Sequence, residues 1–130
     1  MTPTKALIDT DFVVLSADKK ATVEHWDEGL YERLDANYES FEGHELIACH
    51  SFDSDWPTWE IHPRGDEIVI LLSGRATFLL QTESGEETVE LGEAGEYVIV
   101  PRNTWHTAKT PQASKMLFIT PGEGTENRPV

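Results

Sequence analysis

Residues 59–74 constrain this chain more than any other stretch, because three side chains of ligand type surround one tight turn. Alternation along an extended strand places Glu60 and His62 on the same face. The following Pro63-Arg64-Gly65 predicts a turn, since proline suits its second position and glycine its fourth. Glu67 then opens a second, apolar strand. A turn of this kind can bring both carboxylates and the imidazole to a common point.

A second segment, residues 95–106, is built in a related way. Its apolar residues up to Val100 predict a strand that stops at Pro101. A polar turn follows, and the chain re-enters with His106. The stretch between the two segments is long enough for about one hairpin, so both can belong to one sheet.

Together the two segments resemble the paired motifs of the cupin family of small β-barrels. The first family motif is G-x5-H-x-H-x3,4-E-x6-G. Here Glu60 stands where the first histidine is usual. His62, Glu67 and Gly74 match the second histidine, the glutamate and the closing glycine in spacing.

The second family motif is G-x5-P-x-G-x2-H-x3-N. Gly95, Pro101 and His106 match its spacing. Asn103 replaces the internal glycine, and Thr110 replaces the final asparagine. The resemblance covers half of the chain directly. It implies an all-β fold, a cupin barrel of the double-stranded β-helix or jelly-roll type, with a short N-terminal helical segment.

The resemblance implies a site for one divalent metal ion, with Glu60, His62, Glu67 and His106 as its ligands. Carboxylate oxygen and imidazole nitrogen both bind divalent ions near pH 7. Two carboxylates balance the charge of such an ion. This favours the harder metals manganese and ferrous iron, with zinc and nickel as alternatives. Glu60 or Glu67, if released from the metal, could act as a general base in catalysis.

The family's reactions include dioxygenation, isomerisation and decarboxylation, so the resemblance implies a metal-dependent enzyme acting on a small organic molecule. Two other interpretations stay open. One is a non-catalytic sensor or storage module that binds a small ligand or a metal. The other is a structural barrel without metal, in which Glu60 bonds Arg64, Lys109 or a backbone amide.

A length of 130 residues predicts a single domain, with its barrel core at residues 45–120. Short apolar segments separated by turn residues about every ten positions are typical of an all-β barrel or sandwich. The N-terminal extension, residues 1–44, carries an apolar stripe at every fourth position over residues 26–38, which predicts a helix. The tail, residues 121–130, is rich in glycine, proline and charge and is expected to be mobile.

The formal net charge of −14 limits the expected partners. Nucleic acid and anionic membranes both require a basic patch, so neither is expected to bind. Residues 68–72 are apolar on both strand faces. We expect residues 26–38 or, in preference, a second subunit of a homodimer to cover the outer face. The single cysteine, Cys49, lies in an apolar run and is interpreted as a core residue. The absence of a signal-peptide pattern and of a long apolar segment favours a cytoplasmic location.

Other side chains capable of chemistry have simpler interpretations. Three histidines without partners at motif spacing are assigned to surface or structural positions: His25, His44 and His50. Three tryptophans flank the motifs: Trp56, Trp59 and Trp105. They either line a pocket for a flat or apolar substrate or pack in the core and at interfaces.

Overall fold

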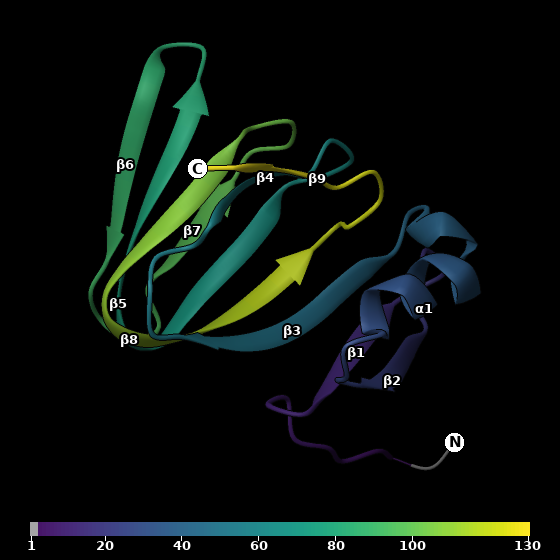
Figure 1. Cartoon of the computed structure of the whole chain (residues 1–130). Coiled ribbons are helices and arrows are strands. Elements are labelled where there is room, and N and C mark those ends of the chain that lie inside the picture. Colours follow the sequence, from purple (N-terminus) through teal and green to yellow (C-terminus); the bar gives the residue numbers. More distant parts are fainter. Residues whose placement is uncertain (1–2) are drawn as a thin grey trace.

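Residues 3–130 are described by a computed structural model, in which nine strands join into one sheet (Figure 1). In chain order the elements are β1 (Asp11–Leu15), β2 (Ala21–His25), α1 (Leu30–Asn37), the 3-10 helix η1 (Glu39–Phe41), β3 (Glu45–Phe52), β4 (Thr58–Ile61), β5 (Glu67–Thr82), β6 (Gly85–Leu91), β7 (Tyr97–Val100), β8 (His106–Thr120) and β9 (Glu126–Pro129). One path through the sheet runs β2-β1-β3-β8-β4-β9, while β5 pairs with β6, β7 and β8. The predicted all-β fold is confirmed.

The two longest strands, β5 and β8, form the frame of the barrel. At the start of β5, Glu67, Val69 and Leu71 are buried, because every second side chain points inward. The inward side chains of the strands and of one loop form the barrel core: Trp56, Val69, Leu71, Ala76, Phe78, Leu80, Leu91, Val98, Val100, Ala108, Met116 and Phe118. The sheet curls around this core and leaves one side open (Figure 1).

Two positions of the family motifs are explained by backbone conformation. Gly74 has φ +84°, and a Cβ there would lie 2.1 Å from the carbonyl oxygen of Ala113 on β8. Only glycine fits at this crossing, where β5 and β8 change register. Asn103, which replaces the motif's internal glycine, has φ 60°. Asparagine tolerates this left-handed conformation better than most residues, so the turn keeps its shape.

The N-terminal extension continues the sheet beyond β3 and covers part of its inner face. β1 pairs with β3, opposing Val14 to Leu46. Leu30 and Leu34 of α1 are buried against these strands in a second apolar cluster. The helix begins at Leu30 rather than at Trp26, because the Asp27 carboxylate accepts the Gly29 N–H in a turn that precedes it. None of the helices within residues 3–130 has the length and apolar character needed to cross a bilayer.

The outer face of β5 and β7 is apolar and stays open to solvent. Leu72 is 39% exposed, Tyr97 60% and Ile99 52%. Ile70 lies between them, opposite Tyr97 on one neighbouring strand and Leu117 on the other. Helix α1 packs on the inner face of the sheet, so it does not provide the outer cover that we expected from residues 26–38.

The tail contains a strand that sequence analysis did not identify. Glu126–Pro129 forms β9 and pairs with β4, opposing Glu60 to Asn127. Within the tail that we expect to be mobile, residues 126–129 extend the sheet beside β4. The pattern hid this strand because its side chains are exposed and polar, so no apolar alternation marks it. Cys49 is buried, as predicted.

Candidate metal centre

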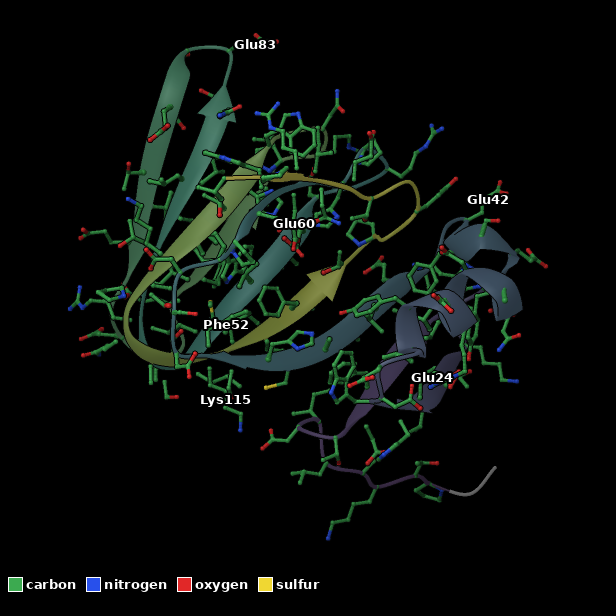
Figure 2. The ribbon with its side chains drawn as sticks, in the orientation of Figure 1. Glu24, Glu42, Phe52, Glu60, Glu83 and Lys115 are labelled. Atoms are coloured by element: carbon green, nitrogen blue, oxygen red, sulfur yellow. The ribbon has the colours of Figure 1, made fainter. Side chains whose placement is uncertain are left out.

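Three strands bring the four predicted ligand residues to one place on the concave side of the sheet. Glu60 lies near the end of β4, and His62 follows the last residue of that strand. Glu67 is the first residue of β5, and His106 is the first residue of β8, where it pairs with Glu60. Figure 2 shows Glu60 inside the curved sheet, facing its open side. We call these four residues the acid–imidazole cluster.

The acid–imidazole cluster is tight enough to surround one ion. One ligand atom from each of Glu60, His62 and His106 lies within 4.8 Å of the other two. Glu67 sits behind them, with Oε1 3.1 Å from His106 Nε2 and Oε2 3.4 Å from His62 Nε2. Glu60 Oε1 is 3.6 Å from His62 Nε2.

In each imidazole ring, Nδ1 contacts a group outside the cluster. This contact determines whether Nε2, which points into the cluster, carries a hydrogen or a lone pair. His106 Nδ1 lies 3.0 Å from the carbonyl oxygen of Thr104, which can only accept, so Nδ1 carries a hydrogen. In a neutral ring, Nε2 then has a lone pair pointing at Glu67 Oε1, another acceptor. Two acceptors at 3.1 Å repel each other unless a proton or a metal cation lies between them.

His62 is held in a related manner by the tail. Its Nδ1 lies 2.8 Å from the hydroxyl of Thr125. Its Nε2 is buried and has no hydrogen-bond partner within the described part of the chain. A buried imidazole nitrogen without a partner is unfavourable, and it faces two carboxylates. This arrangement is the one expected of a nitrogen that binds a cation.

Burial differs sharply within the acid–imidazole cluster. His106, Glu67 and His62 are 0%, 2% and 4% exposed. The Glu60 side chain is 32% exposed, so it is the member that meets solvent. Any small molecule that approaches the cluster from the open side of the sheet therefore meets Glu60 first.

The pKa values of the two glutamates are displaced in opposite directions. Burial opposes ionisation of Glu67, but the hydrogen bond from His106 and the nearby imidazole of His62 together outweigh it and lower its pKa to about 2. Burial, together with the charge of Glu67, raises the pKa of Glu60. Burial lowers the pKa of His106, but the hydrogen bond to Glu67 and the charge of Glu67, with smaller contributions from the Thr104 carbonyl and Glu60, together outweigh it, so the net direction is upward. Without metal, the site thus favours an ionised Glu67 and makes His106 easier to protonate than a free imidazole.

The donor set fits a divalent metal ion. Two imidazole nitrogens and two carboxylates are the ligands that manganese, iron, zinc and nickel all accept. Hydrogen bonds from outside orient them, and Thr120 Oγ1 donates to Glu67 Oε2 at 2.6 Å. Three threonines thus support the ligands: Thr104, Thr120 and Thr125. Sequence analysis missed all three, and no local signal marks them.

The structure assigns different surroundings to the remaining candidates. Trp56 is buried in the barrel core, and its ring centroid is 6.3 Å from that of His106. The Arg128 guanidinium lies over Trp105, with its Cζ 4.3 Å from the centroid of the tryptophan ring. His25 lies beside Asp11 at the surface, and His44 bonds the Glu42 carbonyl. These two histidines stay apart from the cluster, as predicted.

Two surface hollows lie outside the acid–imidazole cluster. One of about 330 Å³ is polar and has Arg64, Asp66 and Arg102 in its wall. The other, of about 270 Å³, lies between the N-terminal extension and β3 and has Asp9, Trp26, His50 and Lys115 in its wall. Neither includes a member of the cluster.

Comparisons with known proteins agree with this architecture. A family model described as the cupin domain matches residues 54–120. No curated protein matches the chain. Among solved structures, a variant of oxalate decarboxylase from B. subtilis aligns with a TM-score of 0.55 and 16% identity, over 66% of this chain and 24% of that chain.

Two further structures are similar at the level of the fold. Recombinant oxalate oxidase in complex with glycolate gives a TM-score of 0.54 at 18% identity, over 63% of this chain and 45% of that one. Hydroquinone 1,2-dioxygenase from Sphingomonas sp. TTNP3, with 4-hydroxybenzoate bound, gives 0.50 at 15% identity, over 58% of both chains. The alignments span less than two thirds of each of these proteins.

Proposed function

The chain belongs to the cupin family, and on that premise we propose that it binds one divalent metal ion and acts as a metal-dependent enzyme on a small organic molecule. Glu60, His62, Glu67 and His106 would hold the ion. The observation that carries the proposal is the convergence of one ligand atom each from Glu60, His62 and His106, all within 4.8 Å of one another. The Nε2 of His62 is buried there without a hydrogen-bond partner in residues 3–130, 3.6 Å from Glu60 and 3.4 Å from Glu67, so a cation held between these groups would satisfy it.

The identity of the ion follows from charge and ligand type. Two carboxylates and two neutral imidazoles around a divalent ion give a site of net charge near zero. Such an oxygen-rich site favours manganese or ferrous iron over zinc or nickel. It would also attract anions less strongly than a site with three histidines and one glutamate, which keeps a positive charge.

A metal bound here would polarise an oxygen atom of the substrate. Glu60, if released from the metal, would supply a proton acceptor, since it is partly open to solvent and its raised pKa suits a general base. Glu67 and His106 are fully enclosed and would hold the metal ion in a fixed position. The solved relatives are named for reactions on oxalate and hydroquinone. Both are small oxygen-bearing molecules, in line with oxygenation, isomerisation or decarboxylation as the reaction type.

Elemental analysis of protein purified without a metal-leaching tag tests the proposal. We expect about one divalent ion per chain, a large loss in His106→Ala and a smaller one in Glu60→Gln. His44→Ala, which changes a histidine outside the cluster, is the matched control and should keep its metal. Equally low metal in all four proteins would leave a structural barrel. Oxygen uptake with a panel of diols, thiols and keto acids then separates an enzyme from a binding module.

We further propose that two copies associate through the outer face of β5 and β7. Leu72, Tyr97 and Ile99 expose large apolar surfaces there, beside Ile70. Two chains of charge −14 repel each other, so an association needs a face without charge, which this one offers. Analytical ultracentrifugation should show a dimer that Ile99→Lys dissociates. A cytoplasmic location is proposed from the one buried, unpaired cysteine.

A further inference from the structure

The N-terminal extension places a tyrosine on the concave side of the sheet, the side that also holds the acid–imidazole cluster. Tyr31 lies in the first turn of α1, on the inner side of the sheet. Its hydroxyl is 3.3 Å from Nε2 of His50, a half-buried residue of β3. His50 opposes Met116 on β8, a member of the barrel core, so its side chain belongs to the concave face. The tyrosine and histidine therefore form one polar pair beside the open side of the barrel.

A continuous row of rings links this pair to the cluster. We call it the aromatic wall, and its members are Trp26, Tyr31, His50, Phe118 and Trp56. Neighbouring ring centroids are 6.0 Å apart for Trp26 and Tyr31, 5.5 Å for Trp26 and His50, 5.8 Å for His50 and Phe118, and 5.9 Å for Phe118 and Trp56. The last ring is 6.3 Å from His106. The wall thus ends at a candidate metal ligand.

The outer end of the aromatic wall is accessible, whereas its inner end is not. Tyr31 is 50% and Trp26 39% exposed, although both are large rings that usually bury most of their surface. The hollow of about 270 Å³ adjoins Trp26 and His50 at this end, and the Asp9–Lys115 ion pair borders its far side. At the inner end Trp56 is buried, and its Nε1 has no hydrogen-bond partner in residues 3–130. The wall therefore offers exposed rings outside and an unused donor within.

We propose that the aromatic wall is the substrate-binding side of this site and takes a small flat molecule of the phenol class, an uncharged aromatic ring bearing one or more hydroxyl groups. The proposal rests on the proposed function, since the ring's hydroxyl would point to the metal ligands. Ring faces favour a flat aromatic partner in stacked or edge-on contact. The half-open carboxylate of Glu60 can accept a hydrogen bond from a hydroxyl group, whereas it would repel a carboxylate.

The charges around the aromatic wall support a neutral ligand. Although half of the Tyr31 surface is exposed, partial burial of its phenol raises the pKa, and the charges of Glu60 and Glu67 add to this effect. Burial lowers the pKa of His50. Both polar groups of the wall are therefore neutral near pH 7.

Calorimetric titration with catechol tests the proposal, using protein as purified and the same protein after removal of metal with a chelator. We expect Tyr31→Ala to raise the dissociation constant at least about fivefold in both forms. Tyr31→Phe keeps the ring and should raise it about threefold. Tyr97→Ala removes an exposed tyrosine from the outer face of β7 and should change nothing. The metal content should stay the same in all three variants, and cyclohexanol and benzoate should bind more weakly than catechol.

Testing the protein both as purified and after removal of metal distinguishes a failure of this proposal from a failure of the proposed function. If no metal is ever found, the metal-free titrations still report on the aromatic wall alone. Unchanged affinity in Tyr31→Ala and Tyr31→Phe would overturn the wall, and so would equal binding of cyclohexanol or an absence of catechol binding to the native protein. Loss of metal in His106→Ala without loss of catechol binding would support the wall and leave the metal site as a separate matter.

Discussion

Replacing Glu67 by glutamine should change how the stability of the metal-free protein depends on acidity. The pKa of Glu67 is lowered from 4.5 to about 2 in the folded state. At about 1.4 kcal/mol for each pKa unit, the ionised carboxylate contributes about 3 kcal/mol to folding. A lowered folded pKa stabilises above the unfolded value, and the contribution is lost as pH falls from about 4.5 to about 2. Glutamine at this position does not titrate, so the free energy of unfolding of Glu67→Gln lacks this pH-dependent contribution.

Urea unfolding followed by circular dichroism, from pH 6 to pH 2.5 and without metal, measures the effect. We expect the free-energy difference between the native protein and Glu67→Gln to shrink by about 3 kcal/mol over this range. The comparison cancels the contribution of the acidic groups outside the acid–imidazole cluster. Glu87→Gln, on the exposed strand β6, serves as the control and should follow the native protein throughout. A constant difference between the native protein and Glu67→Gln would refute an ionised, hydrogen-bonded Glu67.

Three other expectations follow from the same coordinates. Metal affinity, measured by calorimetry between pH 8 and pH 5, should fall with falling pH, because protons compete at His106 and binding releases them; a flat profile would contradict ligation by imidazole. Thr125→Val should weaken metal binding about tenfold or more with little change in stability, because it removes the hydrogen-bond partner of His62 Nδ1. The control Thr82→Val, at the β5–β6 turn, should leave metal binding unchanged. In urea unfolding, Gly74→Ala should destabilise the protein by at least about 2 kcal/mol, since the added Cβ would meet the Ala113 carbonyl. The control Gly85→Ala, with open space around the added Cβ, should cost about 1 kcal/mol.

Much of the barrel was predictable from local pattern. Alternation on β5 and the turn residues between strands follow from the two-residue period of an extended chain. Strand lengths are less predictable, because residues 67–82 and 106–120 are continuous bent strands although each contains a residue typical of turns, Gly74 and Pro111. A strand can bend through an irregular register without ending, and the sequence pattern of a bulge resembles that of a turn.

The four members of the acid–imidazole cluster were predictable from spacing, whereas the groups around them were not. Glu60, His62 and Glu67 are close in the chain, and a single turn limits where their side chains can go. Thr125 is 63 positions from His62, and Thr120 is 53 from Glu67. Such pairs depend on how β8 and β9 fold back, which no local pattern encodes.

The sequence by itself determined an all-strand barrel and the residue types that meet in it, because strand period, turn chemistry and ligand spacing act over a few residues. The tertiary structure alone decided which nitrogen of each imidazole faces inward, which glutamate meets solvent and where the N-terminal helix lies. These properties arise from contacts between segments far apart in the chain, such as Thr104 and Thr125 with the two rings and α1 with β1 and β3. Burial and distant partners, rather than local pattern, set the charge state of Glu67 and the position of Tyr31.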